Sequence, residues 1–175
     1  MKIAVAAHSE DSGLDEKTVQ LVDELAKCSP IPTIYVGGYW GLMRRVVDEA
    51  LKRRLTVVAI LPIEREDVEV PEGLITVKSG CEYRCRSVAL VRSADVLIAL
   101  GGAAGTMIEV LMAYAMGKPT FVLTGTGLAT DKLPLAFPDY VDDRRSARVT
   151  YSGDPRALAR AACSAGSAQK ILEIG

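Results

Sequence analysis

Short aliphatic runs alternate along the chain with segments whose apolar residues recur every three to four positions. Residues 3–7 show the first pattern, and Val19, Val22 and Leu25 show the second. The runs are typical of buried strands and the spacing is typical of amphipathic helices. Their alternation predicts a doubly wound α/β domain with a mainly parallel sheet in three αβα layers. The expected strands cover residues 3–7, 33–36, 56–61, 74–77, 96–100, 120–123 and 149–151, and the expected helices 14–27, 41–53, 82–94, 105–116 and 155–165.

Two of the expected strand-to-helix turns are rich in glycine, VGGYWGLM at 36–43 and LGGAAGTMIE at 100–109. Glycine lets a backbone approach a ligand closely, and the helix that follows offers unpaired N–H groups to an anion. Tight packing of strand against helix is the alternative explanation of each turn. Because open α/β sheets bind ligands at the carboxyl ends of their strands, we expect a phosphate-bearing ligand there. The candidate binding residues are Gly37, Gly38, Gly41, Leu42, Met43, Gly101, Gly102, Gly105, Thr106 and Ser9.

The composition limits the classes of protein to which the chain can belong. The 175 residues, 49% of them hydrophobic, suit one domain over residues 1–175. Lys and Arg total 21 against 22 Asp and Glu, and the net charge of −1 leaves no global positive field to hold nucleic acid. The apolar run at residues 3–7 is too short for a signal peptide or a membrane span. We therefore expect a cytoplasmic protein that binds neither nucleic acid nor membrane.

The four cysteines, Cys28, Cys81, Cys85 and Cys163, are scattered along the chain. A cytoplasmic setting would keep them reduced. Cys81 and Cys85 stand four apart in a segment expected to be helical, where side chains lie farther apart than a disulfide prefers. A zinc site would need more ligands, and the single histidine, His8, is remote in sequence. The sequence thus predicts small buried cysteines and no metal site.

Several well-known signatures are absent: neither turn reads G-x-G-x-x-G, and the chain has no G-x4-G-K-[ST] and no G-x-S-x-G. It does contain GG-x-x-GLM at 37–43 and GG-x-x-GT-x-x-E at 101–109, with a segment ending VRSAD at 91–95 between them. This combination resembles the LONELY GUY and molybdenum-cofactor-carrier superfamily, once labelled lysine decarboxylase-like, over about residues 1–125. The resemblance implies a Rossmann-like fold.

The resemblance also implies roles for two residues. LONELY GUY enzymes release a cytokinin base from its nucleoside 5′-monophosphate and carry the motif P-G-G-x-G-T-x-x-E. When Gly105 and Thr106 are placed on its Gly-Thr, the catalytic glutamate falls on Glu109 and the catalytic arginine on Arg86. The chain departs from this motif in a way that resembles the carrier-protein branch. Gly101 replaces the proline, Ala103 the second glycine, Ile108 an acidic residue, and Ser87 the lysine after the arginine.

Glu109 is the single carboxylate in the apolar segment 105–116. Burial of an ionised carboxylate is costly unless a cation or hydrogen bonds compensate it, and Arg86 is the candidate cation. We therefore expect Glu109 and Arg86 to face one cleft, within direct or water-bridged reach. An exposed position for Glu109, and a solvated basic face for Arg86 and its neighbouring arginines, are the alternatives.

Other polar and aromatic residues near the turns allow two interpretations each. His8 and Ser9 follow the first strand and would either touch a ligand or form an ordinary polar loop. Tyr39 and Trp40 would either stack on a base or cover the core or a subunit contact.

These observations favour a binding or carrier protein for a nucleotide or another phosphorylated heterocycle, of the molybdenum-cofactor-carrier type. The alternative is a nucleoside 5′-monophosphate phosphoribohydrolase, in which Glu109 would stabilise charge at the ribose or position water and Arg86 would orient the substrate. A structural oligomer with a decayed pocket is a third possibility. Lysine decarboxylation through pyridoxal phosphate has no support, because no cluster identifies a Schiff-base lysine and a partner for the ring nitrogen. We expect no required cofactor, and a nucleotide, phosphate or molybdopterin-type ligand in the site.

The segment 105–116 also bears on assembly. A peripheral helix of an α/β domain should present a polar face to water, and this segment is apolar on nearly every side. It therefore predicts a homodimer or higher homo-oligomer formed through this helix, which the resemblance also implies.

Overall fold

Seven strands form one parallel sheet in the order β4-β3-β2-β1-β5-β6-β7. The computed structural model describes residues 1–168, so the last part of the expected domain 1–175 lies outside the described residues. The expected strands are confirmed to within a residue or two. Their bounds are β1 Lys2–Ala6, β2 Thr33–Val36, β3 Val57–Leu61, β4 Leu74–Lys78, β5 Val96–Ala99, β6 Thr120–Leu123 and β7 Val149–Ser152.

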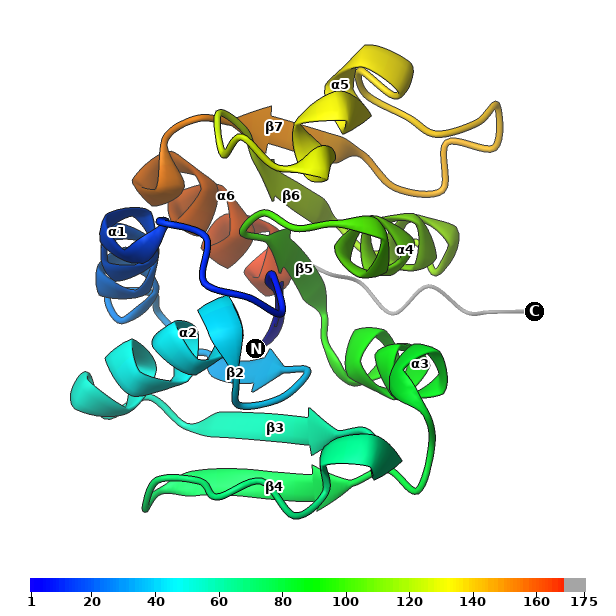
Figure 1. The fold of residues 1–175 in the computed structure, drawn as a ribbon. Coiled ribbons are helices and arrows are strands. Elements are labelled where there is room, and N and C mark those ends of the chain that lie inside the picture. The colour runs from blue at the N-terminus through cyan, green and yellow to red at the C-terminus, as the bar shows by residue number, and fades with distance from the viewer. Residues whose placement is uncertain (169–175) are drawn as a thin grey trace.

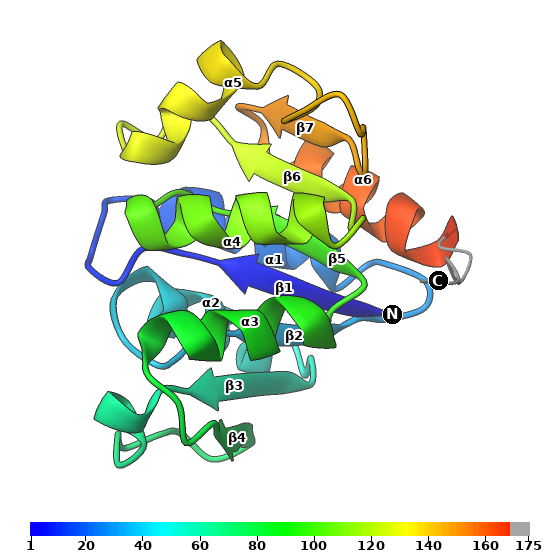
Figure 2. The same cartoon turned by 90° about the vertical axis from the view of Figure 1, so that its right-hand side faces the viewer.

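Helices cover both faces of the sheet and complete the three-layer Rossmann-like fold (Figures 1 and 2). The first layer packs α1 (Asp15–Leu25) against both α2 (Gly41–Lys52) and α6 (Pro155–Ala168). The second layer pairs α3 (Tyr83–Ser93) with α4 (Ala104–Ala115). Each layer seals its own cluster of buried aliphatic side chains against the sheet. Within the described chain, none of these helices is long and apolar enough to cross a membrane.

The sequence pattern left the glycine- and proline-rich stretch after β6 unassigned. There the chain forms a 3-10 turn, η2 (Ala129–Lys132), followed by one short helix, α5 (Leu133–Ala136). A second 3-10 turn, η1 (Ile63–Arg65), occupies the polar loop after β3. Such single turns carry too few apolar positions for a periodic signal, so sequence periodicity does not reveal them.

The direction in which successive strands are added to the sheet reverses at β1. This strand pairs with β2 on one side and with β5 on the other. The connections that follow β1 and β5 therefore lead to helices on opposite faces (Figure 1), and sheets of this kind bind ligands at the carboxyl edge between two such strands. Small residues at the end of β1, Ala6 and Ala7, leave space above this edge.

The expectation of free cysteines was wrong. Cys28 forms a disulfide with Cys163, with 5.8 Å between the Cα atoms, where the end of α1 packs on α6. Cys81 forms a disulfide with Cys85, with Cα atoms 5.5 Å apart. The helical-spacing argument failed because Cys81 lies in the turn before α3, not on the helix, so the distance between adjacent helical turns does not apply. Both Cα separations lie within the usual range for disulfides.

Candidate functional site

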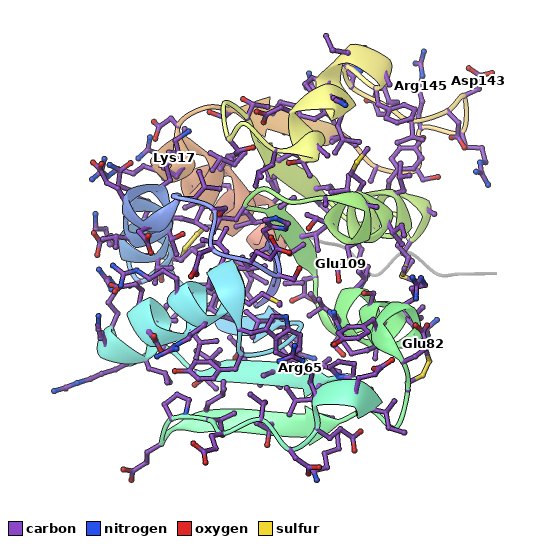
Figure 3. All side chains as sticks on the ribbon, viewed as in Figure 1. Lys17, Arg65, Glu82, Glu109, Asp143 and Arg145 are labelled. Carbon is purple, nitrogen blue, oxygen red and sulfur yellow. A yellow bond between two sulfur atoms is a disulfide. The ribbon has the colours of Figure 1, made fainter. Side chains whose placement is uncertain are left out.

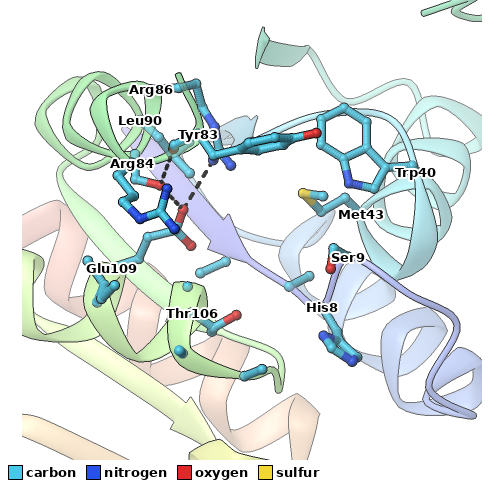
Figure 4. A pocket seen from close by; sticks show the side chains of 18 of the residues that line it. His8, Ser9, Trp40, Met43, Tyr83, Arg84, Arg86, Leu90, Thr106 and Glu109 are labelled. Atoms are coloured by element: carbon cyan, nitrogen blue, oxygen red, sulfur yellow. Dashed lines mark hydrogen bonds and ion pairs between the residues drawn. The ribbon is translucent and has the colours of Figure 1, made fainter. Parts of the chain in front are cut away.

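A cavity of about 480 Å³ opens at the carboxyl edge of the sheet, above β1, β2 and β5 (Figure 4). The loop after β1, the turn after β2 and the first turns of α3 and α4 all contribute to its wall. The structure brings these sequence-predicted residues together at the cavity: Ser9, Gly37, Met43, Arg86, Gly105, Thr106 and Glu109. The other candidates do not line it: Gly38, Gly41, Leu42, Gly101 and Gly102.

Arg86 and Glu109 form a buried ion pair on the cavity wall. Arg86 Nη1 donates to Glu109 Oε1 at 3.1 Å, which confirms the expected direct contact. The two residues are only 7% and 5% exposed, and Figure 3 places Glu109 in the interior, whereas the labelled Asp143 and Arg145 lie at the periphery. Helices α3 and α4 pack side by side and carry one member each, so the packing of the second helical layer fixes the pair.

Ser87 also donates a hydrogen bond to Glu109. Its Oγ lies 2.7 Å from Glu109 Oε1 and 3.1 Å from the carbonyl oxygen of Tyr83, but a hydroxyl carries one proton. The hydroxyl proton of Ser87 is therefore shared between two acceptors, and the shorter contact is its hydrogen bond to Glu109 Oε1. Burial raises the pKa of Glu109, against the opposing effects of Arg86 and Ser87.

We expect the stability of the protein to fall as pH rises through the raised pKa of Glu109. The folded state holds this proton more tightly than the unfolded chain, whose carboxyl titrates near 4.5. The stabilisation is therefore complete below the unfolded pKa and is lost above the folded one. Urea unfolding between about pH 5 and pH 8 measures the free energy of unfolding of the wild type and of Glu109→Gln, whose amide cannot titrate. As the pH rises, this free energy should fall for the wild type relative to the variant. A difference between the two proteins that does not vary with pH would contradict the assignment.

Glu109 keeps one oxygen for the cavity. Both of its hydrogen bonds go to Oε1, and Oε2 has no hydrogen-bond partner within residues 1–168. Arg86 likewise has a buried Nε without a hydrogen bond to any described residue. Gly37 makes room for this arrangement, since a Cβ at that position would overlap the guanidinium of Arg86. The pair is thus held in place, yet its hydrogen-bonding capacity is not exhausted.

The first turn of α4 presents free hydrogen-bond donors to the cavity. Its N-cap residue is Ala103, whose side chain has no atom that accepts a hydrogen bond, so the first N–H groups of the helix have no side-chain cap. Thr106 is 5% exposed, and its hydroxyl has no hydrogen-bond partner in the described part of the chain (Figure 4). Gly105 lies open: apart from its chain neighbours and the backbone of its own helix, no described atom lies within 4 Å of the position that a Cβ would occupy. An anion fits this combination of N–H groups and hydroxyl.

The glycine turn after β2 is built differently. The N–H of Leu42 lies within hydrogen-bonding distance of the carbonyl oxygens of His8 and Glu10, at 3.1 and 3.3 Å. Gly41 has a φ of +52°, and a Cβ there would collide with the backbone of Ser9 and Glu10. The loop after β1 therefore closes over this turn and uses its donors. Packing, the alternative explanation given above, accounts for Gly41.

Sequence reasoning missed several residues that shape the site. Thr130 holds the turn before α4, since its N–H and hydroxyl bond to the backbone of Gly102. Nothing in the sequence links Thr130 to that turn, because the two are joined only by the fold. Tyr83 and Arg65 also line the cavity. A signal for Tyr83 was present, since it stands three residues before Arg86 and so shares its helix face.

Tyr39 and Trp40, which the sequence did not distinguish, point in different directions. The hydroxyl of Tyr39 donates to Asp48 of α2 at 2.8 Å, and Tyr39 does not line the cavity. Trp40 does line it, together with His8. Among residues 1–168 there is also no group of three or more His, Cys, Asp or Glu residues that would hold a metal ion.

Comparison with protein families gives one match over most of the chain: the SLOG cluster4 family matches residues 2–158. A search among curated proteins finds no significant match.

Solved structures resemble the whole fold. The structural-genomics target TM1055 is 32% identical over 91% of this chain and 96% of its own, with a TM-score of 0.81. The molybdenum cofactor binding protein of the phototrophic bacterium Rippkaea orientalis is 24% identical over 93% and 95%, with a TM-score of 0.74. The Moco carrier protein of Chlamydomonas reinhardtii is 21% identical over 95% and 97%, with a TM-score of 0.70. The single-stranded DNA-binding DNA processing protein A of Helicobacter pylori is 16% identical over 92% and 79%, with a TM-score of 0.63.

Proposed function

The chain belongs to the SLOG cluster4 family, and from this membership and the geometry of the cavity we propose that it binds a nucleotide or another phosphorylated heterocycle as a carrier of the molybdenum-cofactor-carrier type. The observation that carries the proposal is the uncapped start of α4, together with Thr106, a buried residue that lines the cavity and whose hydroxyl has no hydrogen-bond partner among residues 1–168. Arg86 supplies a buried positive charge on the same wall. Backbone N–H groups, a hydroxyl and a nearby cation are suited to a phosphate.

Binding without turnover is favoured by the state of Glu109. A phosphoribohydrolase needs negative charge beside the ribose as the glycosidic bond breaks. Burial raises the pKa of Glu109, and Arg86 and Ser87 occupy the same carboxyl oxygen. A carboxylate whose charge is already compensated by Arg86 stabilises developing positive charge poorly.

The phosphoribohydrolase remains a second candidate on one observation. Oε2 of Glu109 has no hydrogen bond to any of residues 1–168, and Glu109 lines the cavity. A ribose hydroxyl or an attacking water would have access to this oxygen. In this role Arg86 would orient the substrate.

Incubation with a panel of nucleoside monophosphates separates the two candidates. Calorimetry measures binding, and chromatography measures release of free base and ribose 5-phosphate. Binding with intact nucleotide recovered supports the carrier, and release of free base identifies the hydrolase. Thr106→Val, which replaces the hydroxyl with a methyl group of similar size, should weaken binding about tenfold by removing a hydrogen bond to the phosphate.

The preferred ligand in this proposal is a small molecule, not a nucleic acid. The resemblance to DNA processing protein A, at 16% identity, is a resemblance of fold. The chain carries a net charge of −1, whereas a nucleic-acid site needs many cations along the phosphate backbone. A single-stranded oligonucleotide in the same panel should therefore not bind at physiological salt concentration.

We further propose that α4 contributes to a homodimer interface. Its inner side buries Val110, Ala113 and Tyr114, while Ile108, which lines the cavity, is 41% exposed. Exposed aliphatic side chains on a helix beside a ligand cavity are suited to contact with a second copy. Light scattering at micromolar concentration should give the mass of a dimer, and Ile108→Glu should shift the protein toward monomer. A wild-type protein that is monomeric at this concentration would exclude the interface.

A further inference from the structure

The far end of the cavity is built from aromatic side chains. Trp40 follows β2, and Tyr83 opens α3 (Figure 4). Their ring centres lie 6.4 Å apart, and the ring planes meet at 89°. Such a corner offers a flat ligand ring one aromatic face to stack on and one edge contact.

The indole of Trp40 is held in place by close contacts with Gly38 and Arg65. A Cβ on Gly38 would overlap the indole, so this glycine allows Trp40 to lie close to the backbone. The guanidinium of Arg65, from η1, lies 5.4 Å from the centre of the indole ring. The other ring, Tyr83, is 36% exposed and reaches toward Trp40 across the cavity, as Figure 4 shows.

This aromatic corner is separated from the first turn of α4. Trp40 follows β2 and the first turn of α4 follows β5, with β1 between β2 and β5. The strands that lead to these two ends, β2 and β5, are thus two strand spacings of about 4.8 Å apart, or about 10 Å. A phosphate attached close to a ring is too short to reach both ends, whereas a sugar-length spacer allows it.

We propose that Tyr83 and Trp40 form a binding subsite for the planar heterocycle of a ligand whose phosphate lies at Gly105 and Thr106, with a sugar-length spacer across β1 between them. This inference rests on the proposed function and assigns the ring end of the ligand to particular side chains. Ligands in which the phosphate is joined directly to the ring are too short to occupy both ends, so we expect them to bind poorly.

The chain contains a single tryptophan, so its intrinsic fluorescence reports on this corner. We would titrate the protein with guanosine 5′-monophosphate, ribose 5-phosphate and inorganic phosphate, following fluorescence and heat. Guanosine 5′-monophosphate should quench Trp40 and bind at least tenfold more tightly than ribose 5-phosphate, because stacking of one base contributes about that much affinity. Ribose 5-phosphate should bind without the same quenching.

Two tyrosines of the chain give a matched pair of variants. Tyr83→Leu should lower the affinity for guanosine 5′-monophosphate about tenfold and leave that for ribose 5-phosphate unchanged, while Tyr83→Phe keeps the ring and the affinity. Tyr39→Leu removes the neighbouring ring that points toward Asp48, outside the cavity, and should not change either affinity.

The outcomes separate the subsite from the function on which it rests. If guanosine 5′-monophosphate and ribose 5-phosphate bind with equal affinity and Tyr83→Leu changes neither affinity, the proposal of an aromatic subsite is wrong, while the phosphate site stands. If no phosphate compound binds at millimolar concentration, the proposed function fails and the subsite fails with it. Selective loss of nucleotide affinity in Tyr83→Leu supports the subsite.

Discussion

Replacement of Gly105 by alanine should reduce the affinity for a nucleoside monophosphate at least a hundredfold and leave the fold intact. Gly105 lies in the first turn of α4, and apart from its chain neighbours and the backbone of its own helix no described atom lies within 4 Å of the position of the added Cβ. The methyl group would therefore enter the space that the proposed phosphate needs. Alanine also favours a helix over glycine by up to about 1 kcal/mol, so the melting temperature should stay the same or rise. Calorimetry and thermal unfolding measure the two effects on one variant.

Gly153 provides the control for this substitution. It lies between β7 and α6, outside the cavity, and a Cβ there would meet its nearest atom at 3.9 Å. Gly153→Ala should therefore leave nucleotide affinity unchanged. Unimpaired nucleotide binding by Gly105→Ala would rule out the first turn of α4 as the phosphate site.

Arg86→Leu should lower the free energy of unfolding by about 3 kcal/mol and abolish nucleotide binding. Removal of one member of a buried ion pair leaves the other without compensation, and such changes typically cost about 3–5 kcal/mol. We expect the lower end of that range because Glu109, whose pKa is already raised by burial, will take up a proton. Urea unfolding at about pH 8, where this proton is hardest to keep, should show the largest loss.

The double variant Arg86→Leu, Glu109→Gln tests the reason for that loss. It removes both charges, so most of the stability at about pH 8 should return, although nucleotide binding should not. Equal losses in the single and double variants would mean that the packing of Arg86, and not the uncompensated charge of Glu109, determines stability.

The strands and helices were predictable because their signal is periodic and local. Apolar runs such as residues 3–7 and 120–123 became central strands, and the order of βα units gave the parallel sheet. The contact of Arg86 with Glu109 was also predictable, since burial of a carboxylate in an apolar helix demands a partner. Here one physical requirement, together with a family resemblance, was enough to select both residues.

Other features depend on contacts between distant segments. The two glycine turns look alike in sequence, yet the loop after β1 uses the Leu42 donor in one, and the other stays open. To predict the disulfide between Cys81 and Cys85, one would need to know the first residue of α3 to within two positions. Neither distinction is present in local propensity, because tertiary packing decides both.

One end of the cavity is formed by backbone groups and the other by side chains. This difference bears on how the choice of ligand can change within the family. The end at α4 uses backbone groups and a space left by a glycine, which the fold itself dictates. The end at Trp40 and Tyr83 uses side chains from surface turns, which single mutations replace without rebuilding the sheet. Evolution can therefore exchange the ligand while keeping the glycine motif. A shared glycine turn therefore does not identify the ligand, and the residues aligned with positions 40 and 83 should be compared before any ligand is transferred between relatives.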